Sequence, residues 1–297
     1  MREYFIWLMK MLTGAVIVLL VIGVAGAMKD GATGNPAEPG KQVAVVELSG
    51  VIIDTKDIID ELYKHAADEE IQGIVLRIDS PGGAVGPSQE IFRTVRKLKE
   101  RKPIVASMGS VAASGGLYAS LAASKVFAEP GTLTGSIGVI MQIPNFTKVT
   151  EKLGVEMVTV KSGKFKDVGN SFREMTEEER AFLQATIETV YQQFLTDLVE
   201  GRKIPEASAR EFADGRVIVG SRAKELGLVD EFGGVREAAR AIFELKGQPL
   251  APTEEPTLIY PENRFEALTK LFEASEKIAQ VVDGIRPSTL QLMYLMK

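Results

Sequence analysis

Residues 103–120 read Pro103-Ile-Val-Ala-Ser-Met-Gly-Ser-Val-Ala-Ala-Ser114-Gly-Gly-Leu-Tyr-Ala-Ser120. The first part of this stretch is a short apolar run typical of a buried strand, and the Ala-rich last part predicts a helix. Ser114 and two glycines lie where the helix would begin. A strand that leads directly into a helix is the unit from which parallel sheets are built.

The same unit recurs on both sides of this stretch. Strands are predicted over 43–48, 71–78, 103–107 and 125–128, and helices over 58–66, over 88–99 and from about residue 112. Strands that alternate with helices of this length predict an α/β fold with a largely parallel sheet. The later part of the chain is mostly helical. Its predicted elements are a helix from the capping box at 176–179 to about residue 200, a helix after 205, a helix that follows the apolar segment 216–220 and ends at Gly227, and an amphipathic helix over 264–282.

Composition excludes several functional classes. The chain has 297 residues, 45% of them hydrophobic, and a net charge of -5 with no basic excess, so a nucleic-acid partner is not expected. It has no cysteine and one histidine, His65. Disulfides, thiol chemistry and zinc motifs that need two histidines are therefore excluded. We expect no metal and no organic cofactor.

The N-terminus predicts a membrane anchor. Residues 11–28 are uncharged and strongly apolar, and 5–9 extend the run past Lys10. Because about 20 apolar residues span a bilayer core, we interpret residues 1–28 as an uncleaved signal-anchor whose membrane segment is 5–28. The competing interpretation is a cleaved signal peptide, since Ala25-Gly26-Ala27 resembles a cleavage site. The short N-terminal tail favours a cell-membrane protein with one span and an extracytoplasmic body.

Three further segments divide the rest of the chain. Residues 29–42 are rich in Gly and Pro and predict a flexible linker. Residues 43–250 would form the catalytic domain, and 251–297 a C-terminal helical segment and tail. The apolar tail, 287–297, either packs on a surface or occupies a substrate groove, and the sequence leaves both interpretations open.

Ser114 is a candidate nucleophile. Glycines beside a serine at a helix start let a carbonyl approach the backbone, and the free N–H groups of the first turn can stabilise an oxyanion. The alternative is an N-cap serine with small neighbours for close packing. A nucleophilic serine needs a base. His65 falls at the margin of an amphipathic helix, where a solvated surface histidine is expected. The base of a hydrolase with this sequence would therefore be a lysine.

Three other segments are candidates for the same site. Asp79-Ser-Pro-Gly-Gly83 follows a predicted strand and can aim N–H groups outward, although it is also an ordinary turn sequence. Gly131-Thr-Leu-Thr-Gly-Ser136-Ile-Gly138 predicts a tight loop with a hydroxyl. Residues 160–167 hold three lysines, and burial among apolar groups would favour the neutral amine of one of them. The chemistry of the residues alone does not show which of these three lysines would be the base.

These segments together resemble the signal peptide peptidase A family. The matching motifs occur in the order and spacing of that family and cover about residues 42–245 besides the N-terminal span. They are Asp79–Gly83, Ser110–Gly116, Gly135–Val139, Ser162–Asp167, Phe172–Glu179, Asp214–Val217 and Ala223–Gly234. The resemblance implies a membrane-anchored serine peptidase whose fold, with a repeated ββα core, is related to Clp protease and crotonase. Leu117 departs from the family, where an aromatic residue is common.

The resemblance also implies roles for individual residues. Ser114 would be the nucleophile and Lys166 the general base of a Ser–Lys dyad. Ser136 would orient the lysine amine, and the N–H groups of Gly83 and Gly115 would form the oxyanion hole. The implied substrates are cleaved signal peptides and other hydrophobic peptides. The family forms ring-like homo-oligomers in which a neighbouring subunit can complete a site.

Other functions remain open at this point. A membrane quality-control protease of the stomatin-partner type would share the Ser–Lys chemistry, and substrate profiling would separate the two. A crotonase-like acyl-CoA enzyme would share the fold and would turn over CoA thioesters. A non-catalytic crotonase-like membrane scaffold would lack a reactive serine.

Overall fold

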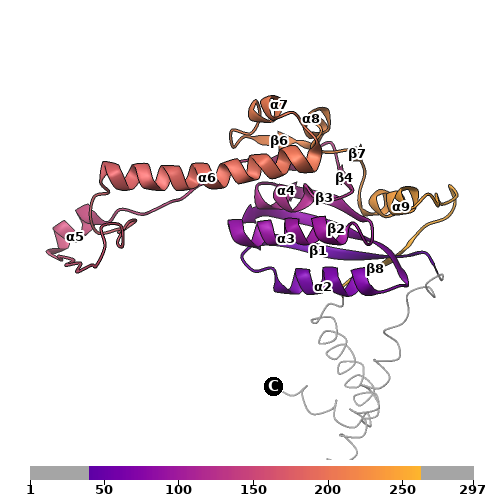
Figure 1. Cartoon of the computed structure of the whole chain (residues 1–297), viewed down its shortest axis with the longest axis horizontal. Coiled ribbons are helices and arrows are strands. Elements are labelled where there is room, and N and C mark those ends of the chain that lie inside the picture. The colour runs from indigo at the N-terminus through magenta and orange to yellow at the C-terminus, as the bar shows by residue number, and fades with distance from the viewer. Residues whose placement is uncertain (1–39, 262–297) are drawn as a thin grey trace, which may run out of the picture. The chain divides into compact units, whose positions relative to one another are not determined.

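A mostly parallel sheet forms the centre of the structure, a computed structural model that describes residues 40–261 (Figure 1). Its main strand order is β6-β5-β3-β2-β1-β8, with β4 beside β3 and β7 beside β4. All the pairs are parallel except β5 with β6. The strands are β1 (Gln42–Ile52), β2 (Ile71–Gly83), β3 (Ile104–Ala112), β4 (Lys125–Ala128), β5 (Leu133–Gly135), β6 (Val217–Val219), β7 (Glu231–Phe232) and β8 (Thr257–Ile259).

Helices cover both faces of the sheet. Alternate residues of β1 enter two different cores: Ala44, Val46 and Leu48 lie in the larger one, and Val43 and Val45 pack toward α9. The larger core also takes buried residues of α2, α3, α4 and α6. The helices are α2 (Lys56–Ala67), α3 (Val85–Leu98), α4 (Gly115–Ser120), α5 (Thr147–Leu153), α6 (Glu177–Arg202), α7 (Glu206–Arg210), α8 (Gly220–Glu225) and α9 (Val235–Leu245).

The mixed α/β fold with a parallel-rich sheet is as predicted, and strands begin within a residue of the four predicted starts. Three of them, β1, β2 and β3, run further than expected. The prediction that Asp79–Gly83 forms a turn after its strand was wrong, because β2 continues through these residues. A register shift between Ser49 and Val51 lets Gly82 and Gly83 pair with the end of β1. Pairing with a neighbouring strand therefore overrides the local turn preference of Pro and Gly.

Several elements were not predicted, among them α9 and β8. Helix α9 covers the second face of the sheet, and β8 pairs with β1 at its outer edge. Strand β8 lies past residue 250, where the sequence analysis drew the end of the catalytic domain. Its three residues are too few to give a sequence pattern.

A long projection, which we call the arm (residues 141–189), extends from the sheet domain (Figure 1). It consists of α5, the following irregular chain and the first half of α6. Helix α5 has no buried residue. In the 26-residue α6, three of the four buried residues, Phe194, Leu195 and Leu198, lie in the second half, which packs on the domain. The first half of α6 therefore carries the preceding loop away from the core.

Several predicted segments lie outside the described residues. They are the membrane anchor over 1–28, nearly all of the linker, the amphipathic helix over 264–282 and the tail from 287. Within residues 40–261, no helix combines the length and the apolar character needed to cross a bilayer.

Candidate active site

Ser114 lies in the connection between β3 and α4 in a strained backbone conformation. Its φ is 51° and its ψ is -117°, a combination that a residue with a side chain rarely adopts. The Ser114 N–H donates to the carbonyl oxygen of Gly135 at 2.9 Å. Strain of this kind concentrates at functional sites, where the surrounding structure holds it in place. The geometry therefore distinguishes Ser114 from an ordinary N-cap, whose φ is negative.

The two glycine motifs interlock directly beside Ser114. Gly82 has a φ of +100°, and a Cβ added there would lie 2.7 Å from the Gly115 nitrogen and 2.9 Å from the Ser114 Cβ. A Cβ added at Gly115 would lie 3.3 Å from the nitrogen of Gly83. As the first residue of α4, Gly115 has no intrahelical acceptor for its N–H. The backbones of 82–83 and 114–115 are thus in contact, as an oxyanion hole built from both would need.

Ser136 directly follows β5 and lies beside the Ser114 backbone. It follows Gly135, whose carbonyl accepts the Ser114 N–H, and it also has a positive φ, of 52°. Its own N–H donates to the Arg216 carbonyl at 2.7 Å. The Thr134 hydroxyl, which is fully buried, donates to the Ala112 carbonyl at 2.6 Å and fixes β5 to the end of β3. The backbones of four of the five predicted site residues therefore lie close together, although Ser136 does not line the cavity described below.

Ser114 faces a cavity of about 110 Å³ between the sheet domain and α6. Its walls are largely apolar. The phenol of Tyr118 is the only titratable side chain among the described residues that line it. This hydroxyl bonds to Asp197 on α6, and burial followed by that bond raises the pKa of Tyr118 well above its usual range. The phenol therefore stays protonated at neutral pH. The lining residues are Gly83, Val85, Ser88, Ser114, Gly115, Tyr118, Gly138, Val139, Ile140, Val190 and Phe194.

Lys166 does not belong to this cavity. It is exposed on the arm, in the loop before α6. Its neighbour Phe165 stacks on Phe182 with ring centroids 5.1 Å apart. The Lys164 amine pairs with Glu178, twelve residues before Val190, and twelve residues of helix rise about 18 Å. The structure therefore brings four predicted site residues together and leaves the predicted base far from them in the same chain.

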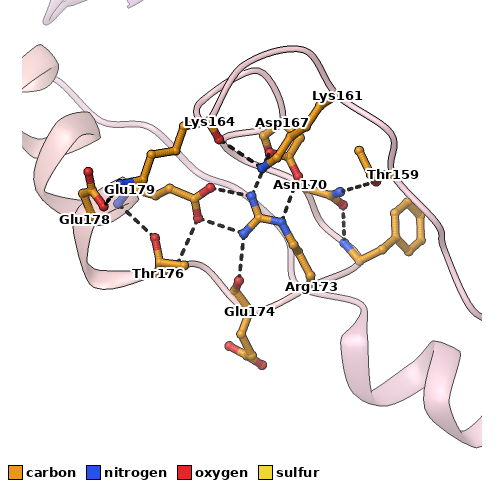
Figure 2. Close-up of polar contacts among 11 residues, drawn as sticks. Thr159, Lys161, Lys164, Asp167, Asn170, Arg173, Glu174, Thr176, Glu178 and Glu179 are labelled. Carbon is orange, nitrogen blue, oxygen red and sulfur yellow. Dashed lines mark hydrogen bonds and ion pairs between the residues drawn. The ribbon is translucent and has the colours of Figure 1, made fainter.

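The three lysines of this loop have different surroundings. Lys161 pairs with Asp167 and also donates to the Lys164 carbonyl at 3.0 Å, and Lys164 pairs with Glu178 (Figure 2). The Lys166 amine makes no hydrogen bond or ion pair with any residue in the described part of the chain. Of the three, it is the amine that remains available to another group.

A partly buried ion-pair network holds the Lys166 loop to the start of α6. Arg173 lies between two carboxylates, donating to Asp167 Oδ2 at 2.9 Å and to Glu179 Oε2 at 2.8 Å (Figure 2). These Arg173 contacts lower the pKa of Asp167 well below its usual range and that of Glu179 to about 2. Glu179 also closes the predicted capping box with Thr176. Because Asp167 follows Lys166 directly, the network fixes the backbone on which the free amine is carried.

Sequence reasoning did not identify Arg173 or Tyr118 as parts of the site. Arg173 falls within a quoted motif, but nothing in its spacing signals that it joins Asp167 to Glu179. Tyr118 follows the nucleophile motif at a helical position and reads as a core residue. Its bond to Asp197 joins segments 79 residues apart, which no local pattern predicts.

The expectation for His65 was wrong. The side chain is 8% exposed, and its Nδ1 has no hydrogen-bond partner among the residues that the structure describes. Burial and the neighbouring Lys64 lower the pKa of His65, so the ring is neutral. His65 lies on α2 and is not among the residues that line the Ser114 cavity. The helix turns this face inward because Leu62 and Ala66 are core residues.

Two family models match the chain. The model of peptidase family S49 matches residues 96–248, and the model named Clp protease matches residues 44–134. The first match contains Ser114, Ser136, Lys166 and the whole arm. The second contains β1 from its third residue, β2 with the glycine loop at 82–83, and β3.

Proteins from several different organisms are similar in sequence to this chain. A protein of Synechocystis named as a candidate protease is 37% identical over 77% of this chain and 83% of its own length. A protein of Enterococcus faecium named as a candidate signal peptide peptidase SppA is 35% identical over 69% of this chain and 64% of its own. The chloroplastic serine protease SPPA of Arabidopsis thaliana is 32% identical over 81% of this chain and 34% of its own.

Proposed function

The chain belongs to peptidase family S49 and is a serine peptidase, and from this premise we propose that it cleaves peptides with a Ser–Lys dyad assembled from two copies of the chain. Ser114 of one copy is the nucleophile, and Lys166 of a second copy is the general base. The observation that carries the proposal is that, within residues 40–261, no usable base lines the cavity at Ser114 and no group pairs with the Lys166 amine.

The reaction is an acyl transfer. The neutral Lys166 amine accepts the Ser114 proton, and the Ser114 oxygen attacks the scissile carbonyl. The N–H groups of Gly83 and Gly115 stabilise the oxyanion, and the Ser136 hydroxyl orients the lysine amine. Lys166 then gives its proton to the leaving amine, and water hydrolyses the acyl-enzyme. The apolar walls of the cavity favour the neutral form of an amine that enters it.

The exposed apolar surface supports assembly from several copies. Beside the Ser114 cavity, Val51, Ile53 and Ile140 are 62%, 76% and 83% exposed. On the arm, Leu153, Val158 and Val160 are 71%, 80% and 95% exposed. Exposed apolar groups in such numbers mark interaction surfaces. An arm that docks beside the cavity of the next copy makes a head-to-tail interface, and such interfaces form rings when the rotation between copies closes.

The substrates we propose are cleaved signal peptides and other hydrophobic peptides. Support comes from the apolar walls of the cavity, among them Val139, Val190 and Phe194, and from the relative named for signal peptide digestion. Anchoring by residues 5–28 to the cell membrane, with the peptidase domain on the extracytoplasmic side, would place the site where such peptides are released.

A comparison of four variants in the detergent-solubilised full-length chain tests this function. We expect hydrolysis of an apolar signal-like peptide to fall by at least about a thousandfold in Ser114→Ala and in Lys166→Ala. Lys164→Ala is the matched control in the same loop and should retain activity, as should His65→Ala. Full activity in Ser114→Ala would contradict the nucleophile assignment, and full activity in Lys166→Ala would contradict the dyad.

A further inference from the structure

Ser80 joins the two backbone segments that meet beside the nucleophile. Its hydroxyl donates to the Gly50 carbonyl at 2.6 Å and accepts the N–H of Gly82 at 3.1 Å. A hydroxyl has one proton and two lone pairs, so both bonds can form at once. The side chain thus ties the glycine loop of β2 to the bulge in β1.

The main chain of Ser80 bonds on the opposite side. Its carbonyl accepts the N–H of Ala113 at 3.0 Å, one residue before Ser114. A Cβ added at Gly116 would lie 2.7 Å from the same carbonyl oxygen, so α4 begins directly against it. Ser80 therefore contacts both segments. Its side chain contacts the segment that leads to Gly83, and its backbone contacts the segment that leads to Gly115.

The Ser80 hydroxyl is not placed to contact bulk solvent or a substrate. Ser80 is completely buried, so its polar atoms do not face bulk solvent. It is absent from the lining of the Ser114 cavity and so does not reach a substrate bound there. If the hydroxyl is removed, the Gly82 N–H and the Gly50 carbonyl each lose a partner, and the loop must shift to regain one.

We propose that Ser80 is a positioning residue that sets the distance between the N–H groups of Gly83 and Gly115 and so shapes the oxyanion hole. The inference rests on the proposed function, in which these two groups stabilise the oxyanion. Such donors act only when they are aimed at the place where the charge develops, so a displaced loop weakens the transition state more than the bound substrate.

The test compares Ser80→Ala with Ser80→Cys and Ser107→Ala in the full-length chain. Ser107 is the matched control, since it is another fully buried serine on the neighbouring strand β3, and its hydroxyl accepts from Arg77 instead. We expect Ser80→Ala to lower kcat by about 10- to 100-fold and to change KM by less than about twofold. Ser80→Cys keeps a weaker donor and acceptor and should lose about three- to tenfold in kcat. Ser107→Ala should match the wild type.

A second readout separates positioning from general loosening. A peptide aldehyde forms a tetrahedral adduct with Ser114 and uses the oxyanion hole, whereas the matching peptide amide only binds. We expect Ser80→Ala to weaken aldehyde inhibition about as much as it lowers kcat and to leave amide binding unchanged. Equal weakening of both ligands, or a kcat within about twofold of the wild type, would overturn the inference.

Two safeguards keep the outcome decisive. If Ser80→Ala does not fold, the same aldehyde-to-amide comparison on Ser80→Cys decides, and an unchanged ratio overturns the inference. Ser114→Ala in the same assay distinguishes a failure of the proposed function from a failure of the role of Ser80. An active Ser114→Ala overturns the proposed function, whereas an inactive Ser114→Ala beside a fully active Ser80→Ala overturns only the role of Ser80.

Discussion

Ser114 and Ser136 are two of three non-glycine residues with a positive φ in the described chain. The third, Lys203, is a helix C-cap, a common place for this conformation. Two serines in an unfavourable conformation, joined through the hydrogen bond from Ser114 to Gly135, mark the site by backbone geometry alone. The same geometry makes the glycine loop opposite them intolerant of any side chain.

Gly82→Ala should abolish peptidase activity. The substitution forces a φ of +100° on a residue with a side chain and puts a methyl group 2.7 Å from the Gly115 nitrogen, so one of the two segments must move. We expect kcat/KM to fall at least about a hundredfold, as when an oxyanion donor is lost. Steady-state kinetics on a purified, folded variant measures it.

Gly86→Ala is the control for this prediction. Gly86 lies four residues further along, on α3, and a Cβ there would meet nothing within 4 Å. We expect unchanged activity and a stability equal to or up to about 1 kcal/mol above the wild type, since alanine is the better helix former. Equal loss in Gly82→Ala and Gly86→Ala would contradict the argument.

At the scale of elements, α6 and its attached loop decide where Lys166, the proposed base, is presented. Its second half is fixed to α4 by the contact of Phe194 with Tyr118, whose ring centroids lie 4.5 Å apart. Its first half carries the network around Arg173. Because one end of α6 is packed in the core, this rigid helix fixes where the Lys166 loop lies relative to the domain.

The stability that Arg173 contributes should depend on pH. Glu179 and Asp167 have lowered pKa values in the folded chain, that of Glu179 about 2. Their contribution is therefore fully present above the ordinary carboxylate range, about pH 4.5, and is lost as the pH falls toward 2. We expect the Tm of Arg173→Gln to lie below that of the wild type at pH 7, with a difference that shrinks below pH 4.5 in calorimetric scans.

Arg222→Gln provides the comparison. Arg222 pairs with Glu225 on α8, with side chains 59% and 63% exposed, and such surface pairs contribute little. Its Tm should stay close to that of the wild type throughout. A Tm difference for Arg173→Gln that is the same at pH 7 and pH 2.5 would contradict the assignment of the stabilisation to the two ionised carboxylates.

Elements with a strong hydrophobic periodicity could be predicted from the sequence. Elements that depend on pairing with a strand distant in sequence could not. The apolar runs of β1 to β4 and the capping box of α6 lie where they were expected. The end of β2 was missed because Gly82 and Gly83 are held by β1 rather than by their own preference. His65 was misassigned because a margin position on an amphipathic helix does not show how far the next layer extends.

At the scale of the whole molecule, the two halves of the proposed catalytic site, Ser114 and Lys166, lie apart in one copy of the chain. The motifs around Ser114, Ser136 and Lys166 could be read from the sequence, but their separation could not. Fifty-two residues of sequence between Ser114 and Lys166 are compatible with contact or with distance, and only the direction of α6 decides. A second copy that supplies Lys166 is the arrangement that this direction favours.

The most direct test mixes two inactive variants. Ser114→Ala keeps an intact arm, and Lys166→Ala keeps an intact cavity, so co-expressed chains should form some interfaces that hold both groups. With random assembly into head-to-tail interfaces, about a quarter of the sites would be complete, and we expect activity up to about that fraction of the wild type. Co-expression of Ser114→Ala with the double variant Ser114→Ala/Lys166→Ala should stay inactive. Mixed assemblies of the two single variants that show no activity, in preparations where both chains are present in one complex, would contradict a dyad shared between copies.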